Sequence, residues 1–177
     1  MPQSEHGGEG NSNSGGAGFD DINGNQGDDT ARGGSGNDWV VGGKDNDLLY
    51  GQTGDDIVYG NMGNDTLFGD AGDDTVRGGQ GDDLILGGIG NDWLSGDRGN
   101  DTLTGGAGAD IFNSFGDAGI DRILDFNRAE GDRIRLEPGS TYDYAQVGSD
   151  LVITVTGGAT VILVGVSTVN LTGDWMI

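Results

Sequence analysis

The chain contains no cysteine, one histidine and only eight lysine or arginine residues among 177 positions. Without cysteine it can form neither a disulfide framework nor a zinc–thiolate site. The single histidine, His6, lies in a polar stretch, so neither a paired-histidine zinc site nor a Ser-His-Asp triad can be assembled. A Gly-x-Ser-x-Gly nucleophile elbow is also absent. We therefore expect no enzymatic activity.

Basic residues and long apolar runs are both scarce. Thirty acidic residues give a formal net charge of −22, which argues against nucleic acid and anionic membranes as partners. No apolar run approaches transmembrane length, so we expect no membrane insertion. Residues 1–14 also lack the basic and apolar regions of a cleavable signal peptide. With a hydrophobic fraction of 33%, composition alone would predict disorder.

What the chain does have is a nine-residue repeat, which occurs eleven times without insertion between Gly15 and Asn113. Each unit reads Gly, Gly, any, Gly, Asn or Asp, Asp, any, apolar, any, and residues 78–86 and 87–95 are clear copies. A fixed period of this length predicts a solenoid, because a merely Gly-rich linker would drift in phase. We expect the first six positions to form a turn and the last three a short strand.

The apolar eighth position is expected to point inward and line a narrow core between two parallel sheets. Its members are Ile22, Ala31, Val40, Leu49, Val58, Leu67, Val76, Ile85, Leu94, Leu103 and Phe112. Glycine at the first, second and fourth positions supplies positive φ and allows close approach of stacked turns. One unit carries Asp45 at its fourth position, and we expect that turn to survive because Asp tolerates the left-handed region.

The sixth position is aspartate in every unit and is the predicted metal ligand. These residues are Asp20, Asp29, Asp38, Asp47, Asp56, Asp65, Asp74, Asp83, Asp92, Asp101 and Asp110. Asn replaces Asp freely one position earlier but never here, which indicates a carboxylate requirement at position six and a conformational requirement at position five. A cation held by carboxylate and carbonyl oxygens, without His, Cys or Met, favours calcium over magnesium.

The repeat resembles the RTX nonapeptide, GGxGxDxUx, of secreted haemolysin-type calcium-binding proteins, over residues 15–113. The resemblance implies an all-β fold, a right-handed parallel β-roll, in which two units complete a coil and unit n stacks on unit n+2. It also implies Ca²⁺ bound between stacked turns. Eleven units provide at most about nine stacked pairs.

After Asn113 the period stops and alternating apolar strands begin. We expect strands at residues 120–126, 132–136, 151–155 and 160–166, the last two joined by a Gly157-Gly158 hairpin, as an antiparallel β cap. The predicted organisation is a flexible polar tail (1–14), the β-roll (15–113) and the capping segment (114–177). Residues 120–136 resemble the capping region of RTX proteases, in which Asp121 and Asp125 are interpreted as surface carboxylates rather than a metal site.

The last four residues, 174–177, are an acid followed by three apolar residues, which resembles the uncleaved C-terminal signal of type I secretion. Together with the repeats, this predicts the type I secretion machinery as a partner and an extracellular or cell-surface location. The chain is thus interpreted as a calcium-binding protein that is unfolded without calcium, with surface attachment or assembly as its role. The alternative is the C-terminal secretion and folding module of a larger secreted protease, lipase or epimerase.

Positions seven and nine should face solvent, yet several of them are large and apolar. They are Trp39, Val41, Ile57, Tyr59 and Trp93 in one set of units and Leu48, Tyr50, Phe68, Leu84 and Leu86 in the other. Such contiguous patches either mark an interface, for self-association or for the C-terminal segment, or reflect only the residue preference of short strands.

Overall fold

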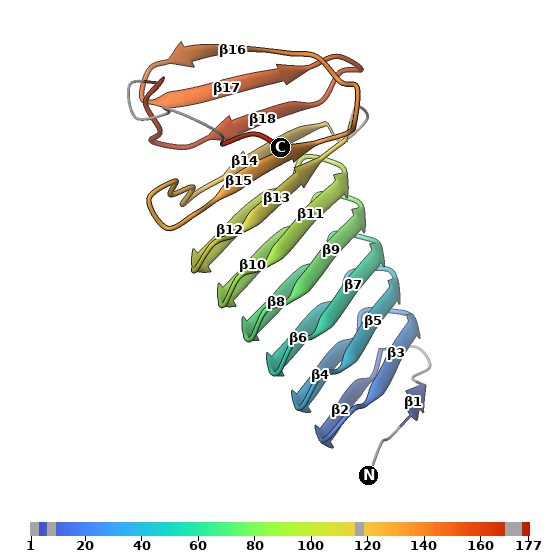
Figure 1. Cartoon of the computed structure of the whole chain (residues 1–177). Helices are drawn as coiled ribbons and strands as arrows, with labels where there is room; N and C mark the ends of the chain where they lie inside the picture. The colour runs from blue at the N-terminus through green and yellow to red at the C-terminus, as the bar shows by residue number, and fades with distance from the viewer. Residues whose placement is uncertain (1–3, 7–9, 116–118, 169–174) are drawn as a thin grey trace.

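The computed structural model describes residues 4–6, 10–115, 119–168 and 175–177, and its regular elements are all β-strands. Successive strands alternate between two sheets, so the chain winds as a solenoid (Figure 1). The eight-stranded sheet contains, in spatial order, β1 (Ser4–His6), β3 (Asp21–Gln26), β5 (Trp39–Lys44), β7 (Ile57–Met62), β9 (Thr75–Gln80), β11 (Trp93–Arg98), β13 (Ile111–Ser114) and β15 (Arg133–Leu136).

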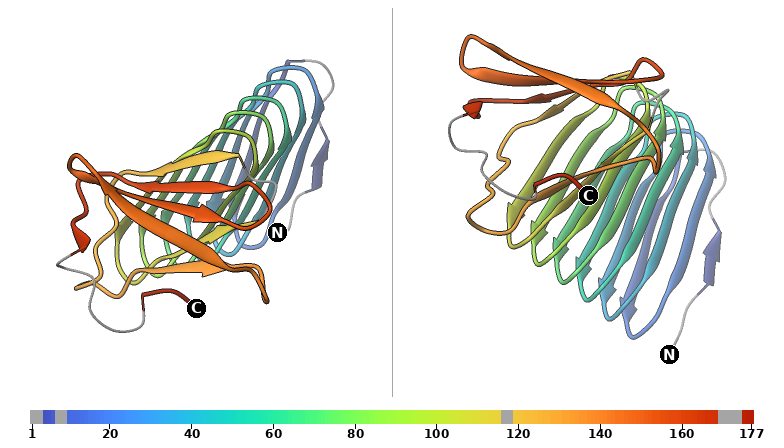
Figure 2. Two further views of the ribbon diagram at one scale, coloured as in Figure 1. Left: turned by 90° about the horizontal axis from the view of Figure 1, so that it is seen from above. Right: turned by 45° about the horizontal axis from the view of Figure 1, so that its top comes forward.

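The ten-stranded sheet lies opposite the eight-stranded sheet. Each coil of the solenoid passes through both sheets and has a flattened outline (Figure 2). Its strands are, in spatial order, β2 (Ser12–Ala17), β4 (Thr30–Ser35), β6 (Leu48–Thr53), β8 (Thr66–Ala71), β10 (Leu84–Ile89), β12 (Thr102–Ala107), β14 (Ile120–Ile123), β18 (Thr160–Leu163), β17 (Asp150–Val155) and β16 (Tyr142–Val147). Among the described residues, no helix is long and apolar enough to cross a membrane.

Each coil stacks on the next with a shift of 18 residues, which is two repeat units. Trp39 in β5 pairs with Ile57 in β7, and Ile57 pairs with Thr75 in β9, all in parallel. The predicted stacking of unit n on unit n+2 is therefore confirmed. The inward position-eight side chains are at most 2% exposed in all eleven units, as expected. Each large aliphatic side chain in this row stabilises the fold by about 1.5–3 kcal/mol.

The strands are longer than the sequence indicated. From β3 to β12 each has six residues, running from position seven of one unit to position three of the next. The first two glycines of a unit therefore lie within a strand, and only positions four to six form the turn. The expected three-residue strand is wrong because ladder pairing continues across the glycines, as in the pairing of Gly43 with Asn61.

The solenoid does not end at residue 113. Strands β14 and β15 stack in parallel on β12 and β13, and their Ile123 and Ile134 side chains extend the buried row. The antiparallel cap predicted at the C-terminal end is present in β16, β17 and β18, with β18 pairing in parallel with β14. Residues 120–136, expected to belong to this cap, instead form one more coil.

The segment interpreted as a polar tail, residues 1–14, contributes to both sheets where it is described. Strand β1 pairs in parallel with β3, and β2, which begins at Ser12, pairs with β4. β1 lies at one end of the stack, and the cap lies at the other (Figure 1).

Candidate metal centre

The position-six aspartates form two buried columns, one along each edge of the solenoid where the turns stack. Within a column, the Oδ1 of each aspartate from Asp38 onward accepts the backbone N–H of the aspartate one coil earlier, as from Asp38 to Asp56 (2.7 Å) and from Asp47 to Asp65 (2.7 Å). One column contains Asp20, Asp38, Asp56, Asp74, Asp92 and Asp110; the other contains Asp29, Asp47, Asp65, Asp83 and Asp101. All eleven are at most 3% exposed.

In ten of these aspartates the second carboxylate oxygen has no hydrogen-bond partner. Within the described part of the chain, Oδ2 is buried without a hydrogen bond at Asp29, Asp38, Asp47, Asp56, Asp65, Asp74, Asp83, Asp92, Asp101 and Asp110. A buried polar atom left unsatisfied costs about 1–3 kcal/mol, and more when it is charged. Each of these oxygens therefore requires a proton or a cation, and a hard cation such as Ca²⁺ fits an oxygen-only site.

The position-one glycine creates the space beside each of these oxygens. A β-carbon on Gly33 would stand 2.6 Å from Asp38 Oδ2 and 2.6 Å from the carbonyl oxygen of Gly51 in the next coil. The glycines in this row do not have positive φ, so they are needed for space and not for conformational freedom. A carboxylate oxygen and a carbonyl oxygen thus converge on the same point, and both are oxygen types that calcium binds.

Carboxylates alone do not complete a site. Over the described ranges, no group of three or more His, Asp or Glu side chains comes together. Any cation between two coils must therefore take most of its oxygens from backbone carbonyls of the Gly-rich turns, with one or two aspartates supplying the charge.

Positions two and four are the ones that need positive φ. All eleven residues at each position adopt it, including Gln52 (82°) at position two and Asp45 (75°) at position four. Asp45 Oδ2 also accepts the N–H of Gly27 at 3.1 Å. The prediction that the turn survives this substitution is confirmed.

Position five has a different role from the one expected. None of its residues has positive φ, so the conformational explanation is wrong. Instead its side chains form a second, exposed ladder in which Asn46 Oδ1 accepts the N–H of Asn64 (2.8 Å) and Asn64 Oδ1 accepts that of Asp82 (2.9 Å). In this outer ladder the N–H of the later residue donates to the Oδ1 of the residue one coil earlier. In the inner ladder the N–H of the earlier residue donates to the Oδ1 of the residue one coil later. Asn and Asp interchange here because each offers the same Oδ1 acceptor.

The inner ladder continues beyond the repeats through residues that sequence reasoning assigned to the surface or overlooked. Asp121 Oδ1 accepts the N–H of Asp101 (3.3 Å), and Asp132 Oδ1 accepts that of Asp110 (3.0 Å); both aspartates are 3% exposed. Asp125 accepts the N–H groups of Gly105 and Gly106. The spacing between hydrogen-bonded aspartates, 18 residues within the repeats, becomes 20 and 22 residues here, so the nine-residue period did not predict the continuation. The Asp-x-Ile pattern at Asp121 and Asp132 was the sequence signal that could have predicted it.

Asp132 ends its column differently from the repeat aspartates. Its Oδ2 accepts the N–H of Asn127 at 2.7 Å, so both carboxylate oxygens are satisfied by the protein. This last rung therefore has no unsatisfied oxygen for a cation.

Burial raises the pKa of the position-six carboxyls from Asp38 to Asp110. The pKa of Asp74 is raised to about 7, mainly by burial and further by the neighbouring charges of Asp92 and Asp56. The pKa of Asp83 is raised to about 8 by burial, with additional repulsion from Asp101 and Asp65. Without a cation, the folded chain therefore holds protons at pH values where the unfolded chain has released them.

This difference predicts that the metal-free fold is more stable at acidic than at neutral pH, the reverse of a protein whose carboxyl pKa values are lowered by folding. The folded-state pKa is about 6 at Asp56 and about 8 at Asp83, against 3.8 ordinarily, so the folded state binds more protons than the unfolded state between these values. In excess chelator the folded state should then lose stability as pH rises from about 4 to 8, so the sheet content should be highest near the acid end and fall toward neutral pH. Far-UV circular dichroism at each pH measures the sheet content. Sheet content that rises with pH over this interval would contradict the assignment.

A solenoid of stacked parallel strands, with columns of buried carboxylates whose Oδ2 atoms from Asp29 to Asp110 have no hydrogen-bond partner, defines a cation-binding β-roll. The family model for the RTX calcium-binding nonapeptide repeat matches residues 14–49, 32–67, 50–85, 59–94 and 86–123, which is more than half of the chain. The chain belongs to this family. Its repeat region is a calcium-binding module of a non-catalytic type.

Two solved structures similar to this chain are as follows. The extracellular lipase LipA from Serratia marcescens aligns with all of this chain at 21% identity and a TM-score of 0.44, and this chain spans 40% of its length. The AlgE6R3 subunit of the Azotobacter vinelandii mannuronan C5-epimerase aligns with 78% of this chain and 81% of its own at 26% identity and a TM-score of 0.46. No curated protein matches the chain significantly.

Proposed function

We propose that this protein is a secreted calcium-binding β-roll that is unfolded without calcium and folds when it binds extracellular Ca²⁺. The observation that supports this most directly is the row of buried Oδ2 atoms without hydrogen-bond partners in the position-six aspartates from Asp29 to Asp110. Carboxylates that repel one another in the metal-free chain become ligands in the loaded one, so binding free energy becomes folding free energy.

The proposed ligands are the eleven position-six aspartates, Asp20 to Asp110, together with carbonyl oxygens of the stacked turns. Up to about nine ions, one between each stacked pair of repeats, would contribute about 18 positive charges against the formal charge of −22. Calcium loading would then neutralise most of the chain.

The proposed domain organisation takes residues 15–113 as the repeat part of the β-roll and residues 114–177 as the segment that adds its last coil and caps it, with residues 1–14 preceding the repeats. Sites of the weak extracellular type, with dissociation constants of about 10⁻⁴ to 10⁻³ M, would be empty in a cell and filled outside it. The chain would therefore pass the type I secretion machinery unfolded and fold in the medium or at the cell surface, where we propose a role in attachment or assembly.

A calcium titration followed by far-UV circular dichroism tests this proposal. We expect a cooperative coil-to-sheet transition near millimolar calcium, with no transition at the same concentrations of magnesium, because magnesium gives up its waters reluctantly. Stable sheet in excess chelator at neutral pH would contradict calcium-dependent folding.

On the outer faces of the sheets, some apolar side chains are covered by their neighbours and others are exposed. Tyr50 and Phe68 stack on each other with ring centroids 4.8 Å apart, and the Arg32 guanidinium covers Tyr50. On the opposite sheet, Trp39 is 43% exposed and lies beside the exposed Ile57. Self-association through this second face is part of the proposal.

The alternative, a C-terminal module of a larger secreted enzyme, shares the calcium switch. The coding sequence upstream of this chain distinguishes the two interpretations, because a module would be preceded in frame by a catalytic domain.

A further inference from the structure

The outer face of the eight-stranded sheet carries a row of side chains that is complementary to itself. Position seven of each unit precedes the inward position eight, so its side chain points outward from the sheet. From β3 to β15 the residues of this row are paired in register between neighbouring strands, in the order Asp21, Trp39, Ile57, Thr75, Trp93, Ile111 and Arg133. From either end, the row has a charged residue, two large apolar residues and then the central threonine. The two end charges are opposite in sign.

This order allows two copies of the face to match each other. A two-fold axis through Thr75, parallel to the strands, brings two such faces together with their rows running in opposite directions. Asp21 of one copy then lies opposite Arg133 of the other. In the same way, Ile57 of one copy lies opposite Trp93 of the other. An isologous dimer requires such a match, because both copies use the same patch of surface.

The large apolar side chains of the row are available to a partner. Trp39 is 43% exposed and Ile57 is 37% exposed. The cap strands β16, β17 and β18 belong to the ten-stranded sheet, so they do not cover this face. Neighbouring exposed aromatic and aliphatic side chains are typical of protein interfaces, and a central tryptophan is a frequent anchor.

The same face is nearly balanced in charge, although the chain is strongly acidic. The outward positions of β3 to β15 include two acidic side chains, Asp21 and Asp97, and three basic ones, Arg77, Arg133 and Arg135, whereas the whole chain carries −22. Within the described part of the chain, neither Asp21 nor Arg133 forms an ion pair. Two copies of this protein therefore repel each other least, and complement each other best, where this face meets itself.

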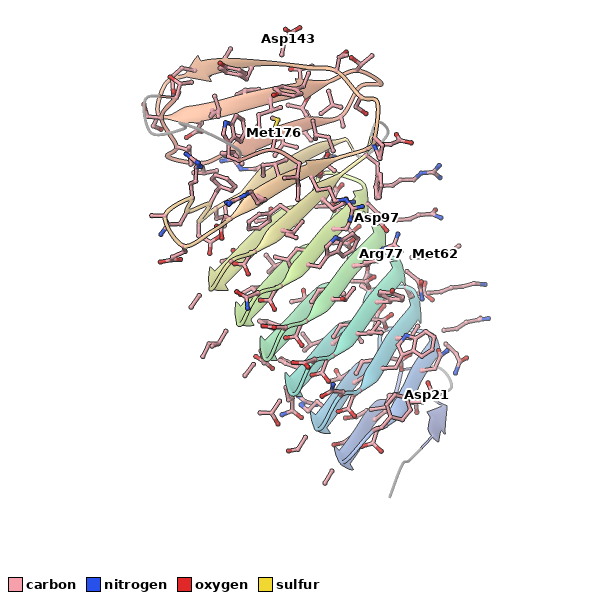
Figure 3. The ribbon with its side chains drawn as sticks, in the orientation of Figure 1. Asp21, Met62, Arg77, Asp97, Asp143 and Met176 are labelled. Carbon is pink, nitrogen blue, oxygen red and sulfur yellow. The ribbon has the colours of Figure 1, made fainter. Side chains whose placement is uncertain are left out.

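The cation closest to the two-fold axis is neutralised within its own chain. Arg77 follows Thr75 on β9, so it faces the Arg77 of the other copy. Its Nη2 and Nε donate to Asp97 Oδ2 at 2.6 Å and 3.1 Å, and its guanidinium stands over the Tyr59 ring at 5.6 Å. Figure 3 labels Arg77 and Asp97 midway along the stack and Asp21 near its N-terminal end. Two ion pairs, and not two bare cations, therefore meet at the axis.

We propose that the calcium-loaded protein forms a two-fold dimer through the outer face of the eight-stranded sheet, with Asp21 of each copy paired to Arg133 of the other. This rests on the proposed function, because the face exists only in the folded chain. Seven strands span about 29 Å and the outward positions about 15 Å, so the dimer buries on the order of 1,000 Å² in total. That area is at the lower end for specific interfaces, so the dimer is reversible.

Sedimentation equilibrium of the full chain through the micromolar concentration range, in millimolar calcium and in excess chelator, tests the dimer. In calcium the mass should rise with concentration from 18.1 kDa toward twice that value, and in chelator it should remain that of one chain. Species larger than two copies would overturn the two-fold interface, because an isologous contact closes at two.

Far-UV circular dichroism of the same samples separates the dimer from the proposed function. A chain that folds in calcium but stays monomeric throughout the range would overturn the dimer and leave the proposed function intact. Sheet and dimer in both samples would overturn calcium-dependent folding and support the dimer. No sheet in either sample would overturn both.

Two variants with the same chemical change on opposite faces locate the interface. Ile57→Glu introduces a charge opposite Trp93 of the other copy, and it should weaken the dimer at least about tenfold because that charge must be buried. Leu84→Glu changes a position-seven side chain of similar exposure, 40%, on the ten-stranded sheet and should leave the dimer unchanged. Equal dimerisation of the two folded variants would overturn the assignment to this face.

A charge exchange tests the antiparallel alignment. Asp21→Arg and Arg133→Asp each place like charges opposite one another at both ends of the interface, so each should weaken the dimer about threefold or more. The double variant restores opposite charges and should recover wild-type association. A folded double variant without recovery would overturn the pairing. If Arg133→Asp does not fold, Asp21→Arg decides the question, and an unchanged dimer in that variant would overturn the pairing.

Discussion

Replacing Asp56, Asp74 and Asp92 together by alanine should raise the calcium concentration at the folding midpoint at least about tenfold or abolish the transition. These residues are three successive rungs of one column, and their Oδ1 atoms accept the N–H groups of Asp38, Asp56 and Asp74. The triple variant loses those three bonds, each worth about 0.5–1.5 kcal/mol, and also three carboxylate ligands. Far-UV circular dichroism during calcium titration measures the midpoint.

Two matched variants separate ligation from hydrogen bonding. Asparagine at the same three positions keeps an Oδ1 acceptor but removes the charged ligand, so it should still weaken calcium binding. Alanine at Asp55, Asp73 and Asn91 removes the exposed position-five ladder beside the same turns and should change the midpoint much less. A wild-type midpoint for the position-six alanine variant would mean that these aspartates are not ligands.

Gly51→Ala is expected to have the second largest effect, although alanine can adopt the backbone conformation of that residue without strain. Its β-carbon would stand 2.6 Å from Asp56 Oδ2 and 2.8 Å from the carbonyl oxygen of Gly69. Neither neighbour can retreat without breaking a ladder, so overpacking should cost about 1–3 kcal/mol. The added methyl group also occupies the space where two candidate ligand oxygens converge, so calcium affinity should fall as well.

The control for this variant is the next residue. Gln52→Ala leaves a residue with a β-carbon at the same positive φ of 82° and adds no atoms, so it should be close to neutral. Urea unfolding in saturating calcium compares the two free energies, and isothermal titration compares their calcium affinities. If Gly51→Ala matched Gln52→Ala in both measurements, the space at position one would have no part in the site.

The features of the nine-residue unit could be predicted because the same residue types recur at the same positions in eleven units. An apolar residue at every ninth position can be buried only if successive strands alternate between two sheets, and this accounts for the inward row from Ile22 to Phe112. The invariance of aspartate at position six likewise identified the eleven residues that the structure buries. Position five was misinterpreted because exchange between Asn and Asp is compatible with both a left-handed turn and an acceptor ladder.

The amino-acid sequence determined the period, the inward row and the identity of the position-six carboxylates, and its resemblance to the RTX family implied the stacking of unit n on unit n+2. Only the tertiary structure decided which glycines provide space and which provide positive φ, because space depends on the coil above, such as the Gly51 carbonyl over Gly33. It also decided that Asp121 and Asp132 continue the columns and that the backbone of Trp175 pairs with Ile134 at the edge of the eight-stranded sheet. Those contacts join segments whose spacing no longer follows the repeat, so periodicity could not reveal them.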